Sequence, residues 1–202
     1  MSNISTHTIA RVVDYLSFLK TQNCEAISAT TIADSLGLNH VQVRKDLAAV
    51  ATGGKPKVGY NREQLMRELS VFLGYDKPAQ AILVGAGNLG KALISYSGFE
   101  SYGLNIVAAF DVAKNIVGTS LFNTPVYHLD TLSEHLSTLG VKIALLCVNV
   151  DSAQAVTDTL IANNIKAIWN FTPKNLKLPP HVVCKNENMP ASFAILSKMV
   201  ED

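Results

Sequence analysis

Cysteine and long hydrophobic runs are both scarce in this chain of 202 residues. Its three cysteines, Cys24, Cys147 and Cys184, are far apart and odd in number, so they indicate neither a metal site nor a disulfide framework. No apolar run approaches the roughly 20 residues that a transmembrane helix needs. The N-terminal stretch MSNISTHTIARVVDYL lacks the cationic start and apolar segment of a signal peptide. We therefore expect a cytoplasmic protein that does not enter a membrane.

Charge is also low, because charged residues make up 16% of the chain and the net charge is +1. Hydrophobic residues make up 48%, which is enough to bury cores. The cations are nevertheless concentrated in one segment. Between positions 40 and 57, Asp46 is outnumbered by Arg44, Lys45, Lys55 and Lys57. Such a cluster is expected where one surface meets an anionic partner.

The N-terminal part has the apolar periodicity of three helices, the first of which follows Ser5 and Thr6. The second is expected to begin after Ser28 and to stop at Gly37, and the third follows Asn39 as its N-cap. Two helices joined by the tight turn GLNH favour a helix-turn-helix. In the third helix one face is apolar and the opposite face carries Val41, Arg44, Lys45 and Ala48, with Gln42 at its edge.

Turn and hairpin signals follow in ATGGKPKVGY, which predicts a small hairpin ending at Tyr60. Asn61, with Gln64 three residues later, resembles the capping box of a fourth helix. The segment GYDKPA then reads as an interdomain linker.

Beyond Gln80 the short apolar runs AILV, LNIVAAF, KIALLCV and KAIWNF mostly alternate with helical segments, which indicates a parallel sheet with covered faces. We expect an α/β protein with a winged helix-turn-helix domain (residues 1–77), a Rossmann domain with a doubly wound parallel sheet (78–188) and a C-terminal helix (189–202). Because that last helix is apolar nearly all round, we expect it to be buried between two subunits. The alternative is that it packs on its own Rossmann sheet.

A candidate phosphate-binding loop, G-x-G-x-x-G, comprises Gly85, Ala86, Gly87, Asn88, Leu89 and Gly90. It follows an apolar strand and opens a helix, so that Gly87 lets the backbone approach a pyrophosphate at the helix N-terminus. Asp111 ends the next strand, where a carboxylate binds the ribose hydroxyls of NAD and repels the 2′-phosphate of NADP. The alternative is a glycine-rich turn without a ligand, but the position of Asp111 favours NAD(H).

Rossmann domains usually serve dehydrogenases, so a small NAD-dependent oxidoreductase is the main alternative function. The chain beyond the last strand-like run is too short for a substrate domain. No tyrosine is followed four residues later by lysine, the pair that short-chain reductases use. His128 and His135 are possible acids, but His128 lies in PVYHLD, which reads as a strand-to-helix loop. We therefore expect no catalytic residue and no enzyme.

The basic third helix followed by a basic hairpin predicts a recognition helix in the major groove of DNA and a wing on the adjacent backbone. Arg44 is suited to pair with guanine and Gln42 with adenine. Lys45, Lys55 and Lys57 would mostly contact phosphates.

Together these pieces resemble the Rex family of redox-sensing transcriptional repressors. The ordered motifs that carry the resemblance span nearly the whole chain: VQVRKDL, VGYNREQL, LVGAGNLGKAL, IVAAFDV, PVYHL and NFTP. The resemblance implies a homodimer that binds a pseudo-palindromic operator in double-stranded DNA, senses the NADH/NAD⁺ ratio and releases DNA when it binds NADH. It also implies that Tyr96 lies near the nicotinamide. We count Val148 and Asn170 among the expected cofactor contacts, and Gly59 and Tyr60 among the expected DNA contacts.

Three positions depart from the family pattern. Pro56 stands where the wing usually has an arginine, Ser17 where the first helix often has one, and Asn188 where a switch aspartate is expected. A serine–asparagine pair lacks the charge-assisted hydrogen bonds of an arginine–aspartate pair. The sequence therefore also allows a regulator with a weakened redox response.

Overall fold

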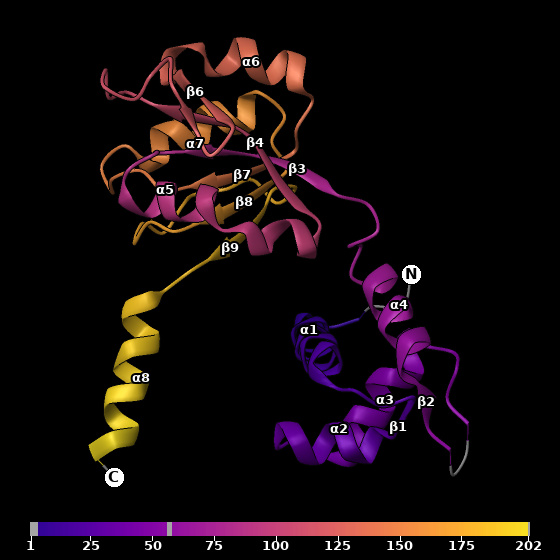
Figure 1. The fold of residues 1–202 in the computed structure, drawn as a ribbon. Helices are drawn as coiled ribbons and strands as arrows, with labels where there is room; N and C mark the ends of the chain where they lie inside the picture. Colours follow the sequence, from indigo (N-terminus) through magenta and orange to yellow (C-terminus); the bar gives the residue numbers. More distant parts are fainter. Residues whose placement is uncertain (1–3, 56–57, 202) are drawn as a thin grey trace. The chain divides into compact units, whose positions relative to one another are not determined.

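The computed structural model describes residues 4–55 and 58–201, and it divides into two compact units (Figure 1). The first unit ends at Lys77 and the second begins at Pro78. The division falls inside GYDKPA. The two units have separate hydrophobic cores.

The first unit consists of helices and one short antiparallel sheet. Its helices are α1 (Thr6–Thr21), α2 (Ala29–Leu36), α3 (His40–Val50) and α4 (Arg62–Phe72), and its strands are β1 (Ala26–Ile27) and β2 (Tyr60–Asn61). The predicted caps Ser28, Asn39 and Asn61 accept hydrogen bonds from first-turn N–H groups, which fixes where α2, α3 and α4 begin. The capping box at Asn61 is only half formed: Asn61 Oδ1 accepts from the Gln64 N–H, but among the described residues no bond returns from the Asn61 N–H to the Gln64 side chain, whose Nε2 donates to Glu68.

One core joins the helices of the first unit. Val43 and Leu47 of α3 are completely buried in it, as their i, i+4 spacing predicted. They pack with Leu16 and Leu19 of α1 and with other buried residues of α2 and α4. The inward face of α3 therefore holds the helix in place, and its opposite face is left exposed.

The second unit contains a seven-stranded sheet in the order β5-β6-β4-β3-β7-β8-β9. Its strands are β3 (Ala79–Val84), β4 (Leu104–Asp111), β5 (Ser120–Leu121), β6 (Thr124–His128), β7 (Ile143–Leu146), β8 (Ala167–Asn170) and β9 (Val183–Asn186). All neighbours pair in parallel except β5 and β6. The six parallel strands have the Rossmann order, with the reversal of strand order beside β3.

Helices cover both faces of this sheet. Helices α6 (Leu132–Leu139) and α7 (Ala153–Ala162) pack on one face, where Val84, Phe110 and Leu146 are buried. Helix α5 (Asn88–Ser95) packs on the other, where Leu83 and Leu145 are buried (Figure 1). A short 3-10 helix, η1 (Ser97–Tyr102), follows α5. The doubly wound arrangement expected from the alternating pattern is confirmed.

Three strands of this sheet were not expected from the sequence. The segment PVYHLD was interpreted as a loop, but its first four residues belong to β6 and His128 is the last residue of that strand. Strand β5 pairs with β6 through a turn at Phe122 and Asn123, both of which have positive φ angles. No helix lies between β8 and β9 among the described residues. These runs are too short and too polar to distinguish from loops by periodicity.

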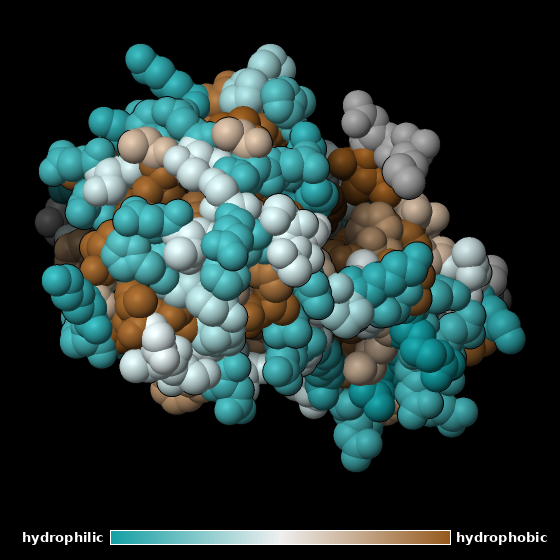
Figure 2. Space-filling view, turned by 90° about the horizontal axis from the view of Figure 1, so that it is seen from above, coloured by the Kyte–Doolittle hydropathy of each residue, from teal (hydrophilic) through white to brown (hydrophobic). Residues whose placement is uncertain are grey.

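The last helix, α8 (Met189–Glu201), has no buried side chain among residues 189–200. Phe193 and Met199 are each 71% exposed and Val200 is 81% exposed. The alternative in which this helix packs on its own sheet is therefore wrong. None of the described helices is long and apolar enough to cross a membrane. The face seen in Figure 2 mixes hydrophilic and hydrophobic residues.

Candidate nucleotide and nucleic-acid sites

The glycine loop joins β3 to α5 at the carboxyl edge of the sheet. Gly85 has a φ of +96°, and a Cβ atom there would lie 2.6 Å from the carbonyl oxygen of Cys147 on the neighbouring chain segment. A Cβ on Gly90 would overlap the carbonyl oxygen of Gly85. Both positions therefore require glycine for backbone packing, as the motif predicted.

Gly87 differs from these two glycines, because a Cβ atom there would meet nothing within 4 Å. It is the N-cap of α5, and among the described residues no side chain caps this helix. The N–H groups of the first turn, at Asn88, Leu89 and Gly90, are left for an outside acceptor and carry the positive end of the helix dipole. Open space beside free donors is what a bound pyrophosphate requires, so the residues present fit a dinucleotide.

Asp111 ends β4 next to this loop, and its carboxylate accepts three backbone hydrogen bonds. Oδ2 accepts from Ala86 N–H at 2.7 Å, and Oδ1 accepts from Val112 and Ala113 N–H at 2.7 and 2.9 Å. The side chain thus joins the ends of β3 and β4. Oδ2 keeps acceptor capacity for a hydroxyl group, because one of its lone pairs has no partner among the described residues.

A cavity of about 210 Å³ lies beside the loop and is lined by Gly85, Gly87, Asp111 and Val148, among others. The structure therefore brings four of the predicted cofactor residues together. Cys147, which the sequence did not single out, also lines the cavity. Burial raises the pKa of its thiol to about 12, so it is a neutral, unreactive wall of this cavity.

Tyr96 does not line this cavity. It is the C-cap of α5, is 55% exposed and lines a separate cavity of about 430 Å³ with Phe99 and Ile106. Its ring meets the Phe99 ring edge to face at 4.9 Å, and Phe99 in turn contacts Trp169 at 5.8 Å. An aromatic cluster thus fixes the position of Tyr96 on the α5 side of the sheet.

Asn170 is fully buried at the end of β8, and its side chain is occupied by the protein. Nδ2 donates to the carbonyl of Lys174 and to Asn186 Oδ1, and Oδ1 accepts from both N–H and Oγ1 of Thr172. An amide group offers two donors and two lone pairs, so none is left for a ligand. The Asn170 side chain therefore holds β9 and the loop after β8, and the expected cofactor contact at this residue stays a prediction.

The outward face of α3 carries the cations predicted to meet DNA. Arg44 and Lys45 are exposed, as are Val41 and Ala48. Gln42 is exposed too, but its amide donates to Asp46 at 2.9 Å, a contact that the sequence analysis did not predict. Because the contact joins positions i and i+4, that spacing was the signal that could have revealed it.

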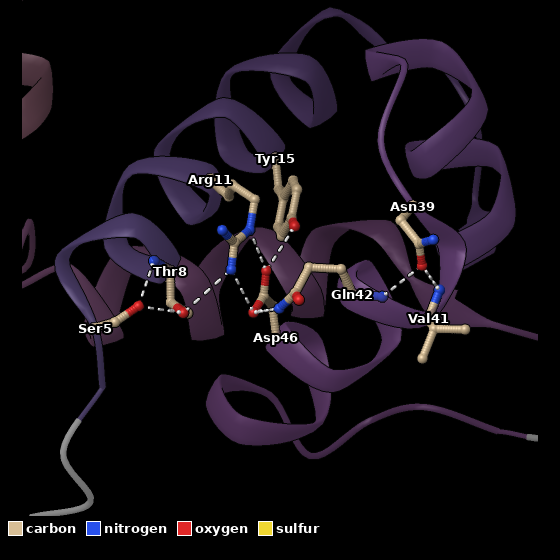
Figure 3. A network of polar contacts seen from close by, with 8 residues as sticks. All are labelled: Ser5, Thr8, Arg11, Tyr15, Asn39, Val41, Gln42 and Asp46. Carbon is tan, nitrogen blue, oxygen red and sulfur yellow. Dashed lines mark hydrogen bonds and ion pairs between the residues drawn. The ribbon is translucent and has the colours of Figure 1, made fainter.

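Asp46 is the centre of a polar network that links α3 to α1 (Figure 3). Arg11 donates to both of its carboxylate oxygens, at 2.7 and 3.0 Å, and Tyr15 donates to Oδ2 at 2.8 Å. Burial alone would raise the pKa of Asp46, but the hydrogen bonds from Arg11, Tyr15 and Gln42 outweigh it and lower this pKa. Sequence reasoning missed Arg11 and Tyr15, which lie 35 and 31 positions from Asp46.

The wing follows α3 and is closed by Lys55 and Gly59, which exchange two backbone hydrogen bonds of 2.8 and 2.9 Å. Lys55 is exposed, as a phosphate contact requires. Gly59 has a φ of +87°, and a Cβ there would overlap the carbonyl oxygen of Ile27. Its glycine is thus required by the fold. Pro56 and Lys57 lie outside the described residues.

Tyr60 is half-buried and packs against the first unit's core, and burial raises the pKa of its hydroxyl. Its ring lies over Gly54, where a Cβ would come within 2.7 Å of it. Tyr60 therefore supports the base of the wing. Glu68 of α4 also supports the base of the wing, because it accepts hydrogen bonds from N–H and Oγ1 of Thr52, just after α3.

Ser17 and Asn188, two of the positions that depart from the family pattern, lie in described parts of the structure. Ser17 is half-buried on α1. Asn188 precedes α8, and its Oδ1 accepts a 3.0 Å hydrogen bond from the N–H of Ala191. Asn188 thus caps the last helix, a role that asparagine performs as well as aspartate does.

The two histidines considered as catalytic acids have structural contacts. His128 caps the short helix η2 (Leu129–Thr131), and its Nδ1 lies 3.3 Å from the carboxylate of Asp130. His135 stacks on Tyr127 with ring centroids 3.7 Å apart. Among the described residues, no group of three or more His, Cys, Asp or Glu side chains could hold a metal ion.

A winged helix-turn-helix unit followed by a Rossmann unit with an open glycine loop defines a class of nucleotide-responsive DNA-binding regulators. Family models agree with each unit: residues 3–48 match "Putative DNA-binding protein N-terminus" and residues 76–174 match "CoA binding domain". The redox-sensing transcriptional repressor Rex of Bacteroides fragilis is 38% identical over 192 residues, which cover 94% of this chain and 87% of that protein. The chain belongs to the Rex family of redox-sensing transcriptional repressors.

Solved structures of a family member agree over the whole fold. RSP in complex with β-NAD⁺ and operator DNA matches with a TM-score of 0.92 and 32% identity, covering 99% of this chain and 94% of that one. RSP in complex with β-NADH matches with a TM-score of 0.89 and 31% identity, covering 99% and 95%. Because these relatives are repressors, the comparison decides against the oxidoreductase alternative.

Proposed function

We propose that this protein represses transcription by binding operator DNA through α3 and the wing, and that its Rossmann unit binds NAD⁺ and NADH to control that binding. The agreement with RSP, which was solved with both kinds of ligand, carries this proposal. Such a regulator acts in the cytoplasm, where bacterial operators are.

For DNA, we propose that Arg44 and Gln42 contact base edges and that Lys45, Lys55 and Lys57 contact phosphates. The exposed basic face of α3 supports this assignment. Gly59 and Tyr60 contribute by shaping the wing rather than through their side chains, because one lacks a side chain and the other packs inward.

For the cofactor, we propose that the α5 N-terminus holds the pyrophosphate, that Asp111 binds the adenosine ribose, and that Val148 packs against the ligand. The open space at Gly87 and the cavity next to it support this placement. Tyr96 is proposed near the nicotinamide on the resemblance alone. The Asn170 side chain supports the neighbouring loop, so Asn170 is not among the side chains proposed to contact the cofactor.

We also propose a homodimer in which α8 of each subunit packs against the other subunit. The support is that α8 exposes the large apolar side chains of Met189, Phe193, Ile195, Leu196, Met199 and Val200, which is costly for a helix that has no partner. A two-fold symmetric dimer places two recognition helices on half-sites about 34–36 Å apart, or a multiple of that, so the operator is expected to be pseudo-palindromic.

The test is a footprint over promoters of the source genome, followed by fluorescence anisotropy on the protected sequence. The expected result is a protected site with two-fold symmetry and a binding constant that depends on the dinucleotide. Absence of any protected site would reject the DNA-binding part of the proposal, and calorimetry with NADH would test the cofactor part separately.

A further inference from the structure

The hydrogen-bond capacity of the Asp46 carboxylate is fully used (Figure 3). Oδ1 accepts from Arg11 Nη2 and Gln42 Nε2, and Oδ2 accepts from Arg11 Nε and Tyr15 Oη. An ionised carboxylate has about four lone-pair sites, and these donors occupy all of them. The Asp46 side chain is 4% exposed, so water does not compete for these bonds.

This arrangement determines which end of the Gln42 amide faces inward. A carboxylate only accepts hydrogen bonds, so the amide nitrogen must face Asp46 and the amide oxygen must face away from it. The backbone of Gln42 is held as well, because its N–H donates to Asn39 Oδ1 at 3.2 Å. Although Gln42 is exposed, it has a defined orientation at both its backbone and its side chain, which lowers the entropy cost of using it in recognition.

We propose that Arg11, Tyr15 and Asp46 are positioning residues that set the Gln42 amide with its oxygen outward, so that Gln42 selects a base bearing an exocyclic amino group. In the major groove, adenine and cytosine present such a donor, whereas guanine and thymine present an oxygen acceptor at the corresponding place. An outward amide oxygen attracts the amino group of adenine or cytosine and repels the carbonyl oxygen of guanine or thymine. This inference rests on the proposed function, since it requires α3 to lie in the groove.

The experiment measures the dissociation constant of the full-length protein for every single-base variant of the footprinted operator half-site. Wild type is expected to prefer adenine or cytosine to guanine or thymine by about tenfold at one position. Gln42→Met keeps a side chain of similar length without hydrogen bonds, and it should reduce that preference to about twofold or less while sparing other positions. The matched control is Gln154→Met, because Gln154 also donates to an aspartate four residues on, in α7 of the second unit.

The positioning role is tested with Arg11→Met and Tyr15→Phe, each checked for native circular dichroism. Both should weaken the preference for adenine or cytosine at the Gln42 position and leave the salt dependence of binding unchanged. A merely destabilised domain would instead bind every sequence more weakly and keep that preference. Because Tyr15→Phe keeps the buried ring, it provides the test if Arg11→Met does not fold. Retention of the full preference in a folded positioning variant would overturn that role, and a Gln42→Met protein with wild-type selectivity would overturn the whole inference. Failure of wild type to bind any operator would instead reject the proposed function.

Discussion

Oδ2 of Asp111 accepts a hydrogen bond from the backbone N–H of Ala86 at 2.7 Å, so the acid that ends β4 is joined directly to the glycine loop after β3. The same carboxylate that is proposed to bind the ribose therefore also shapes the loop proposed to hold the pyrophosphate. The two functions of this residue are not separable by mutation alone, and the cofactor test has to measure both stability and ligand choice.

Asp111→Ala should lower the free energy of unfolding by about 1–3 kcal/mol, because three backbone N–H groups lose their acceptor. It should also weaken NADH binding and reduce the difference between the affinities for NADH and NADPH, because the charge that repels a 2′-phosphate is gone. Calorimetry with all four dinucleotides measures this. Asp130→Ala is the control, since Asp130 is 87% exposed and lies after the adjacent strand β6. Equal affinity of wild type for NADH and NADPH would contradict the assignment.

Arg44→Ala and Lys45→Ala should have different effects on DNA binding, although the two residues are adjacent. Loss of a base contact at Arg44 should cost about 1–3 kcal/mol and relax specificity at one base pair. Loss of a phosphate contact at Lys45 should weaken all sequences alike and reduce the salt slope by about one unit. Anisotropy at several salt concentrations separates the two results. Lys114→Ala, an exposed cation of the second unit, should have neither effect.

Deletion of residues from Met189 onward should give a folded monomer. The described side chains of α8 are all exposed within the chain, so their removal leaves the core of the second unit intact. Sedimentation equilibrium measures the mass, and circular dichroism checks the fold. Phe193→Glu offers a milder version, because it places a charge at a position that is 71% exposed in the single chain. A stable dimer after the deletion would show that the interface lies elsewhere.

The Arg11–Asp46 pair should make the first unit sensitive to acid. The pKa of Asp46 is lowered from 3.8, so its contribution to stability is fully present above about pH 4 and is lost as pH falls through the lower folded-state pKa. Asp46→Ala should lower the free energy of unfolding at pH 7 by about 1–3 kcal/mol, because Tyr15 and the partly exposed Arg11 lose their acceptor. Denaturant unfolding at pH 7, 4 and 2.5 is the measurement. A penalty that stayed constant over this range would show that the ion pair does not carry the effect.

The redox response should be weaker than in relatives with a charged switch pair. Ser17 and Asn188 are both neutral and cannot form a charge-assisted hydrogen bond with each other, and Asn188 is engaged as the cap of α8. A ligand shifts an equilibrium only by its differential affinity for the two states, so we expect coupling below the roughly 1–3 kcal/mol typical of allosteric proteins. The operator dissociation constant without ligand, with NAD⁺ and with NADH, at one salt concentration, decides this. A hundredfold loss of DNA affinity with NADH would contradict it.

The sequence by itself determined the local features of this protein. The caps Ser28 and Asn39, the glycine loop and the alternation of strands and helices all depend on residues within a few positions of one another, so pattern and spacing predicted them. Tertiary structure decided everything that depends on contacts between distant segments. It buried the amide of Asn170 and brought Arg11 to Asp46. It also paired the edge strand β5 with β6 and the opposite edge strand β9 with β8. No local pattern shows which partner satisfies a buried polar group, because the packing of remote elements determines which donors and acceptors come within reach.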